Sequence, residues 1–227
     1  MRRWLEAGVD LVFPPRCVGC GRRGQVWCPT CEQSLRRLEG GLCVRCGAAL
    51  DGAVGCSLCR ARPFPLTARS FALYDGPLAR AIVSLKYRPN RALARVMADW
   101  LGQVCRREGW RPTLVVPVPL GRDRLRRRGY NQASLIASAL ADRLGLPMED
   151  SALRRVRETR SQVGLDPASR LANVQGAFQA DPGPFQGKHV LLVDDLFTTG
   201  ATLAACAEAL MDVGAEQVHG ITVGRAR

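Results

Sequence analysis

Eight of the ten cysteines in this chain lie in one short segment, and all eight belong to Cys-x-x-Cys pairs. Two thiolates at this spacing share a tight turn and reach one tetrahedral Zn²⁺ with bonds of about 2.3 Å. A segment this short cannot build a sufficient hydrophobic core, so bound metal has to supply its stability. The predicted metal ligands are Cys17 and Cys20, Cys28 and Cys31, Cys43 and Cys46, and Cys56 and Cys59.

These four pairs fit two structural Zn²⁺ ions. Every ligand would be a protein thiolate, which leaves no open position for catalysis. The first and second pairs are separated by a short interval, and so are the third and fourth, which favours two successive ribbons. A cross-braced arrangement, in which the first pair joins the third and the second joins the fourth, is the alternative. An iron–sulfur cluster or redox-active dithiols are less favoured uses of the same pattern.

The positive charge of the chain is concentrated in its middle. The whole sequence carries 33 Lys and Arg against 20 Asp and Glu, a net charge of +13. Residues 86–160 hold 17 basic and seven acidic side chains, whereas residues 161–227 hold four basic and seven acidic ones. Such a region attracts phosphate groups, either of a sugar phosphate or of a nucleic-acid backbone. The alternative is that most of these arginines only solvate the surface.

Strands and helices alternate after the cysteine segment, and the Pro-rich residues 62–65 read as a linker. We therefore expect an N-terminal helix and double zinc ribbon over residues 1–62, followed by a second domain over residues 63–227. The alternation predicts an α/β fold with a parallel sheet flanked by helices. The expected strands are 71–74, 114–118, 190–193 and 218–223, and the expected helices are 4–13, 77–86, 91–106, 132–144 and 201–213.

The sequence shows neither an export signal nor a transmembrane segment. Acidic residues interrupt the apolar part of the N-terminus, and no stretch approaches the roughly 20 apolar residues that a spanning helix needs. We expect a cytoplasmic protein, with peripheral contact to the inner face of the membrane as the alternative.

The most informative motif follows the apolar run from Val190 to Val193. Two adjacent carboxylates at the end of a strand suit hydrogen bonds to the vicinal hydroxyls of a ribose. The Thr-rich turn beyond them opens a helix, and its N–H groups, hydroxyls and helix dipole form a site for a phosphate. One ligand, a ribose 5-phosphate, satisfies both halves. The predicted binding residues are Asp194, Asp195, Thr198, Thr199, Gly200, Ala201 and Thr202.

Three competing interpretations of this motif are weaker. A Walker B strand would need a P-loop, and the segment Gly183–Lys188 has the wrong spacing and no Ser or Thr. A dinucleotide-binding fold would need Gly-x-Gly-x-x-Gly after a strand, and the sequence contains none. An ordinary acidic turn does not account for two adjacent aspartates followed by Thr-Thr-Gly-Ala-Thr.

The motif resembles the signature of type I phosphoribosyltransferases that binds phosphoribosyl pyrophosphate (PRPP), and the whole chain resembles the ComF family of competence-associated proteins. The resemblance covers essentially the full length. Besides the four cysteine pairs after Phe13-Pro14-Pro15 and the 190–202 motif, the matching segments are Leu85-Lys86-Tyr87, Val116-Pro117-Val118-Pro119, Arg128-Gly129-Tyr130-Asn131-Gln132, Thr159-x-x-Gln162 and Arg170-x-x-Asn173.

This resemblance implies a phosphoribosyltransferase-like domain over residues 63–227. The two aspartates would hold the ribose hydroxyls of PRPP, and Thr198 to Thr202 would hold its 5-phosphate. The turn after Val116 would face the pyrophosphate, with Mg²⁺ bound mainly by that diphosphate. Family members are linked to DNA uptake and natural transformation. The implied partners are therefore internalised single-stranded DNA and other competence proteins.

Two functions remain open from the sequence. A transferase would release pyrophosphate from PRPP, and arginines would offset the developing charge. A non-catalytic protein would keep the PRPP site as a sensor or scaffold while its basic surface handles single-stranded DNA. A PRPP-responsive regulator is a third and weaker reading. The catalytic residues are unknown, and the candidates are Arg126, Arg127, Arg128 and Arg160.

Overall fold

The computed structural model describes residues 14–50, 55–61, 64–157 and 176–226. The expected helix over residues 4–13 and the candidate Arg160 lie outside this part of the chain, as do the Thr159-x-x-Gln162 and Arg170-x-x-Asn173 segments. The expected boundary between residues 62 and 63 also lies there and stays a prediction.

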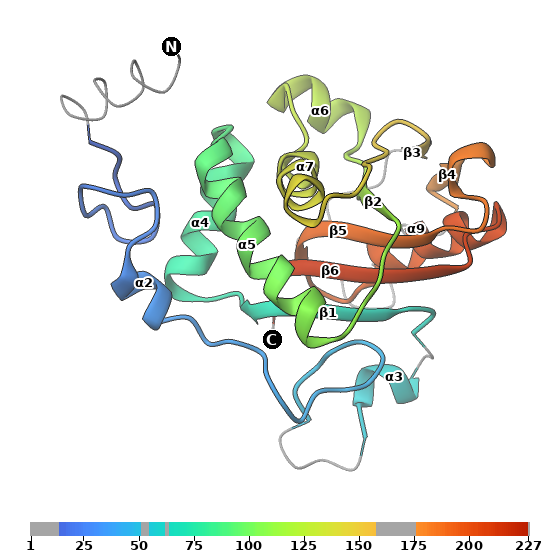
Figure 1. The fold of residues 1–227 in the computed structure, drawn as a ribbon, viewed down its shortest axis with the longest axis horizontal. Coiled ribbons are helices and arrows are strands. Elements are labelled where there is room, and N and C mark those ends of the chain that lie inside the picture. Colours follow the sequence, from blue (N-terminus) through green and yellow to red (C-terminus); the bar gives the residue numbers. More distant parts are fainter. Residues whose placement is uncertain (1–13, 51–54, 62–63, 158–175, 227) are drawn as a thin grey trace.

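A four-stranded parallel sheet with strand order β1-β6-β5-β2 forms the centre of the molecule (Figure 1). Both faces of this sheet are buried, which is why its strands read as continuous apolar runs. Along β5, for example, Leu191 and Val193 pack in one hydrophobic cluster, and Val190 and Leu192 pack in the other. The strands are β1 (Thr67–Leu73), β2 (Leu114–Pro117), β5 (His189–Phe197) and β6 (Gln217–Arg225).

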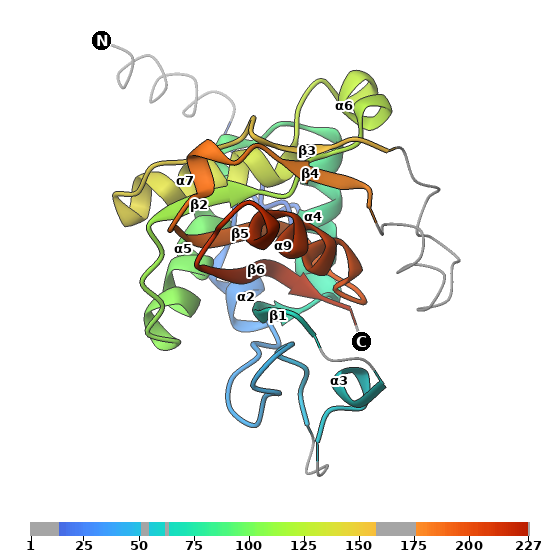
Figure 2. The same cartoon turned by 90° about the vertical axis from the view of Figure 1, so that its right-hand side faces the viewer.

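Different helices cover the two faces of the sheet (Figures 1 and 2). One face packs against α4 (Gly76–Tyr87), α5 (Arg91–Arg107) and α7 (Gln132–Leu144). The other packs against α9 (Ala201–Asp212), the antiparallel pair β3 (Leu153–Arg155) and β4 (Phe178–Ala180), and the short η1 (Gly183–Phe185). The remaining helices are α2 (Pro29–Gln33), α3 (Ser57–Ala61) and α6 (Arg122–Arg128).

Among the described residues, no helix combines the length and the apolar character that crossing a membrane requires.

The structure confirms the predicted parallel α/β architecture. All four expected strands are present, as are the expected helices within the described residues, and most bounds shift by only a few positions. Local signals set several helix ends: Asn90 and Asn131 cap α5 and α7 with their side chains, and Gly145 ends α7 in the left-handed conformation. The sequence did not predict α6, β3 or β4, which are short and largely polar.

The predicted end of the strand at Val193 is wrong. β5 continues to Phe197 because its pairing with β6 continues, with Asp194 opposite Thr222 and Phe197 opposite Arg225. The paired aspartates therefore lie inside a strand, where successive side chains point to opposite faces.

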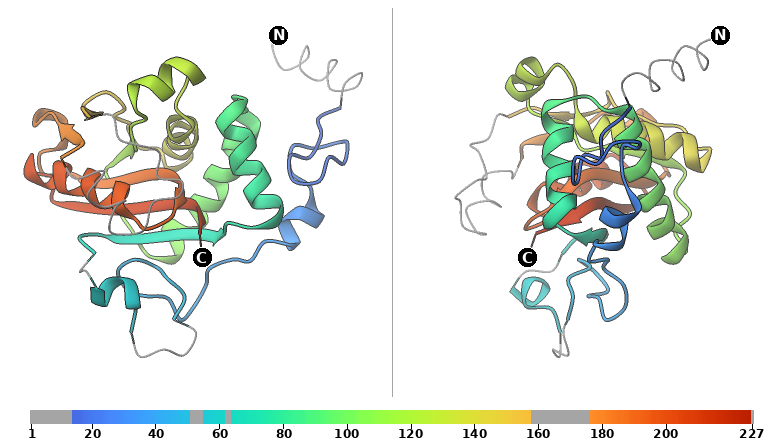
Figure 3. Two further views of the ribbon diagram at one scale, coloured as in Figure 1. Left: turned by 180° about the vertical axis from the view of Figure 1, so that it is seen from behind. Right: turned by 90° about the vertical axis from the view of Figure 1, so that its left-hand side faces the viewer.

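The cysteine-rich segment runs along the open edge of the sheet. The N–H of Leu38 donates to the carbonyl of Phe71 at 2.9 Å, and the N–H of Leu73 donates to the carbonyl of Arg36 at 2.9 Å. Since β1 is an edge strand, these bonds satisfy part of an edge that would otherwise be free to pair with another chain. Figure 3 shows the segment continuing on either side of β1, toward α4 at one end and toward α3 at the other.

A buried ion pair fixes β1 to the neighbouring helix. Arg69 Nε lies 2.7 Å from Glu108 Oε2, with side-chain exposures of 10% and 17%. Replacing Arg69 by Met should lower the free energy of unfolding by about 2 kcal/mol, because Glu108, which is largely buried, would keep only the more exposed Arg107 as a partner. Urea denaturation measures this cost. Arg126→Met, which breaks an exposed pair with Asp123, is the control and should cost less than about 1 kcal/mol. Equal costs in the two variants would contradict the assignment.

Candidate functional site

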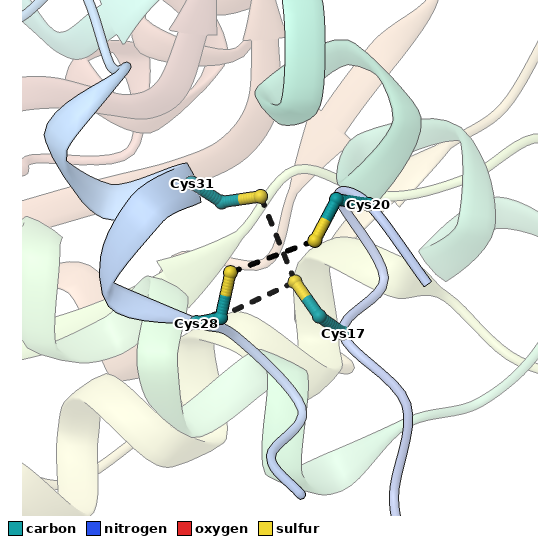
Figure 4. A group of neighbouring side chains, drawn as sticks. All are labelled: Cys17, Cys20, Cys28 and Cys31. Carbon is teal, nitrogen blue, oxygen red and sulfur yellow. Dashed lines mark hydrogen bonds between the residues drawn. The ribbon is translucent and has the colours of Figure 1, made fainter. Parts of the chain in front are cut away.

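The structure brings the eight paired cysteines together as two successive groups. The first cluster comprises Cys17, Cys20, Cys28 and Cys31, and the second comprises Cys43, Cys46, Cys56 and Cys59. Within each cluster all four sulfur atoms lie within 4.8 Å of one another. Figure 4 shows the first cluster, in which four side chains converge from a turn and from α2. The arrangement is sequential, so the cross-braced alternative does not apply.

The spacing of the sulfur atoms suits a tetrahedral metal ion. A ZnS₄ centre with bonds of about 2.3 Å holds its sulfurs roughly 3.8 Å apart. In the first cluster the Cys17–Cys31 and Cys20–Cys28 sulfur distances are 3.7 and 3.6 Å. In the second cluster the Cys43–Cys59 and Cys46–Cys56 distances are 3.7 and 3.5 Å. The donor sets therefore fit two structural Zn²⁺ ions, whereas Cys105 and Cys206 are separately buried in α5 and α9.

Each cluster packs against a different face of the sheet. The first cysteine cluster packs in the hydrophobic core formed with α4, α5 and α7, and the second packs in the core formed with α9. Aromatic contacts join the first cluster to α5: the rings of Trp27 and Trp100 meet edge to face at 5.2 Å, and Trp100 stacks on Phe71 at 5.1 Å. Both indole N–H groups donate to Glu32 Oε2, at 2.8 and 3.1 Å. The metal-binding segment is thus part of the main cores.

A pocket opens at the carboxyl ends of β2 and β5. The chain leaves β2 for α7 on one face and leaves β5 for α9 on the other, so the two loops part. This is the position where open parallel sheets bind ligands. The lining residues come from β5 and the start of α9, from the turn after β2, and from α4, α6, α7 and β3.

The two aspartates reach this pocket from opposite sides of β5. Asp195 is buried and pairs with Lys86 of α4, with 3.0 Å between Oδ2 and Nζ. Asp194 keeps partial exposure in the pocket while lying deep among protein atoms, and its Oδ1 accepts the Asp195 N–H at 2.8 Å. Burial, followed by the charge of Asp195, raises the pKa of Asp194 well above its ordinary value. Burial also raises the pKa of Cys206 on α9, and the charge of Asp194 adds to that shift.

Lys86 places a cation beside this carboxylate pair. Burial disfavours its charge, but the attraction of Asp195 outweighs burial and raises the pKa of Lys86 above its ordinary value. Lys86 therefore stays charged at neutral pH. Its place within the Leu85-Lys86-Tyr87 segment did not by itself indicate a role. The available signal was its type, since nearly all other cations of the chain are arginines.

The basic helix α6 divides its arginines between the pocket and solvent. Arg124 and Arg128 are one turn apart, are partly buried and line the pocket. Arg122, Arg126 and Arg127 are exposed. Of the candidate catalytic arginines, Arg128 therefore lies at the pocket, whereas Arg126 and Arg127 do not line it. Arg155 of β3, which was not among the four named candidates, also lines it.

The segment after α6 ties three parts of the pocket together. The hydroxyl of Tyr130 donates to the carbonyl of Leu85 at 2.7 Å, next to Lys86. Asn131 caps α7 with Oδ1, and its Nδ2 donates to the carbonyl of Val118 at 2.9 Å. Arg128 donates to the side-chain oxygen of Gln132. The segment Arg128–Gln132 thus connects the end of α4, the turn after β2 and α6.

The predicted phosphate-binding turn ends at the N-terminus of α9. Gly200 precedes the helix with φ +77°, and the hydroxyl of Thr199 accepts the N–H of Ala201 at 3.4 Å. A Cβ on Gly200 would lie 2.5 Å from the ring of Phe197, so neither the backbone conformation nor the space admits another residue. Thr198, Gly200, Ala201 and Thr202 line the pocket, and their N–H groups lie at the positive end of the helix dipole.

Two family models match this chain. One, described as a phosphoribosyl transferase domain, matches residues 85–226, and the other, described as a double zinc ribbon domain, matches residues 8–60. The DNA utilization protein YhgH of Salmonella typhimurium is 34% identical over 199 residues, which cover 85% of this chain and 87% of that protein. Competence protein F of Haemophilus influenzae is 30% identical over 222 residues, which cover 91% and 95%.

Among solved structures, glutamine phosphoribosylpyrophosphate amidotransferase from B. subtilis, complexed with ADP and GMP, resembles part of the chain. Its sequence identity is 22% and its TM-score is 0.41, and the likeness covers 62% of this chain and 30% of that one.

The two clusters predict two zinc ions per chain, measurable by atomic absorption on the purified protein. Replacing the buried Cys28 by Ser should reduce the content to about one ion, because a four-thiolate site without one of its ligands binds zinc much more weakly. Cys105→Ala is the control, since Cys105 is buried outside both clusters. It should leave the zinc content unchanged. A loss of zinc in the control, or two ions in Cys28→Ser, would contradict the ligand assignment.

Proposed function

The chain belongs to the ComF family and joins a double zinc ribbon to a phosphoribosyl transferase domain, and we propose that it binds PRPP in the pocket at the carboxyl ends of β2 and β5. One observation carries the proposal. Two carboxylates, the N-terminus of a helix and four cationic side chains converge on a single pocket. The cations are Lys86, Arg124, Arg128 and Arg155.

Each part of PRPP has a counterpart in this pocket. The 5-phosphate would accept hydrogen bonds from the N–H groups and hydroxyls of the turn from Thr198 to Thr202. Asp194 and Asp195 would accept hydrogen bonds from the ribose hydroxyls. The pyrophosphate would face the turn after β2 and the arginines of α6, where bidentate pairing with phosphate oxygens is favourable. Mg²⁺, bound mainly by the diphosphate of the ligand, would supply further charge neutralisation.

The same cations suit the departure of pyrophosphate from C1 of the ribose. Negative charge develops on the leaving group, and Arg124, Arg128 and Arg155 would stabilise it in a pocket partly shielded from water. A transferase releases pyrophosphate when a nitrogen nucleophile is present, whereas a PRPP-binding accessory protein binds the ligand and releases none. Incubation with labelled PRPP, Mg²⁺ and candidate bases separates these two functions.

The PRPP site predicts a selective loss of affinity. In a variant with both Asp194→Asn and Asp195→Asn, calorimetry should show PRPP binding weakened by about a hundredfold or more, since hydrogen bonds to charged groups contribute roughly 1.5–3 kcal/mol each. Zinc content and fold should not change. Asp181→Asn is the control, because Asp181 pairs with Arg154 on the exposed surface. Unchanged affinity in the double variant would sink the ribose assignment.

We also propose that the protein handles internalised single-stranded DNA during natural transformation, in the cytoplasm and together with other competence proteins. Its relatives include proteins named for DNA utilization and for competence. The exposed arginines of α6 offer a basic surface beside the pocket, where a polyanion would release counterions on binding.

The DNA proposal predicts a change in salt dependence. The slope of log affinity for a single-stranded oligonucleotide against log salt is negative, and each phosphate that an arginine neutralises contributes roughly −0.7 to it. Replacing Arg126 and Arg127 by Gln should therefore make this slope less steep by about 1.4. Fluorescence anisotropy over a salt series measures the slope. Replacing Arg91 and Arg95, which are exposed on α5, by Gln removes the same charge elsewhere. If the control flattens the slope as much as the α6 variant does, α6 is not the binding surface.

A further inference from the structure

One buried arginine connects the second cluster to the pocket. Arg225, at the end of β6, donates from Nη1 to the carbonyl of Cys46 at 2.7 Å, and its Nη2 lies 3.7 Å from the Cys46 sulfur. The same guanidinium lies over the ring of Phe197, with its central carbon 4.1 Å from the ring centroid. Phe197 lines the pocket. Arg225 thus contacts a predicted metal ligand and a pocket side chain at once.

A second arginine, Arg45, belongs to the turn that carries Cys46, and it holds Phe64, whose ring lies next to that of Phe197. Arg45, next to Cys46, donates from Nη1 to the carbonyl of Phe64 at 3.0 Å. The ring centroids of Phe64 and Phe197 are 5.6 Å apart. A Cβ on Gly200 would come within 2.6 Å of the first ring and 2.5 Å of the second. The two rings therefore form the surface on which the phosphate-binding turn rests.

The cysteine turn itself is held firmly. A Cβ on Gly47, whose φ is +70°, would lie 2.6 Å from the carbonyl oxygen of Ala68, so this turn packs directly on the backbone of β1. The N–H of Ala68 donates to the carbonyl of Arg45 at 2.7 Å. The second cluster is therefore fixed relative to the sheet, and it can act as an anchor for Arg225.

We propose that Arg225 is a positioning residue that couples the metal-bound second cluster to the geometry of the phosphate-binding turn. The inference rests on the proposed PRPP site, and it gives the second zinc ribbon a role in ligand binding as well as in stability. Close-packed interiors transmit small displacements, so a shift of Phe197 moves the turn at Gly200. The N–H groups of that turn have to meet the phosphate oxygens at hydrogen-bonding distance.

The charges explain why this arginine suits a metal-bound partner. Burying a guanidinium is costly unless an opposite charge or hydrogen bonds compensate it. Four thiolates around one Zn²⁺ carry a net negative charge, and the Cys46 sulfur is in contact with the buried Arg225. Zinc bound in the second cluster would therefore stabilise Arg225 in the position from which it supports Phe197.

The test compares three ligands on the full-length, zinc-loaded protein. In Arg225→Met, calorimetry should show ribose 5-phosphate and PRPP bound about tenfold more weakly, which corresponds to roughly 1.4 kcal/mol. Pyrophosphate does not use the turn and should bind as it does to the unchanged protein. A general loss of structure would weaken all three ligands, so the selective loss identifies positioning.

Arg80→Met is the matched control. Arg80 Nε donates to the carbonyl of Gly19 at 2.5 Å, and Gly19 lies between two cysteines of the first cluster. Arg80 therefore makes the same kind of contact, from an arginine to the backbone of a cysteine turn, at the other predicted metal site. We expect all three affinities to stay unchanged. Zinc content and the thermal midpoint verify folding. If Arg225→Met does not fold, Arg225→Lys replaces it, because lysine keeps the charge near Cys46 but loses the planar stacking on Phe197; the same selective loss is expected.

Two results would overturn the coupling: unchanged ribose 5-phosphate affinity in the folded variant, or an equal loss for pyrophosphate. Absence of PRPP binding to the unchanged protein is a different failure, since it would remove the proposed site itself and the inference with it.

Discussion

The pairing of β5 with strands on both sides is the constraint on which the pocket depends. β2 and β6 hold β5 in parallel register, and the pairing with β6 extends to Phe197 opposite Arg225. This register carries both aspartates into the pocket and delivers the chain to the N-terminus of α9 in a defined direction. The two aspartates therefore come from a strand inside the sheet, where packing limits their movement.

The two cysteine clusters contribute differently to this framework. The first extends the core of α4 and α5 through Trp27 and Trp100, and Glu32 satisfies both indoles. The second packs on the α9 side and reaches the proposed phosphate-binding turn through Arg225 and Phe197. The two ligand sets look alike in sequence, but they have different neighbours. The first cluster therefore has a stabilising role, and the second has the proposed positioning role as well.

Local patterns made much of the fold predictable. Periodicity and capping residues located α5 and α7, and apolar runs located the centres of the strands. The end of β5 was not predictable, because polar Asp194 and Asp195 continue a strand only where β6 offers partners. The short α6 and the β3–β4 pair were not predictable either, because their sequences lack strong periodicity and tertiary contacts determine whether they form.

By itself the sequence determined the chemical groups available: four cysteine pairs at zinc-binding spacing, and a carboxylate pair followed by a Thr-rich turn. Those groups lie close together along the chain, so local geometry is enough to recognise them. Only the tertiary structure decided that the clusters are sequential, that Lys86 meets Asp195 at 3.0 Å, and which α6 arginines face the pocket. Lys86 and Asp195 are distant in sequence, so only the packing of the sheet and helices brings them together. The arginines of α6 lie on different sides of one helix, so only the placement of that helix decides which of them face the pocket.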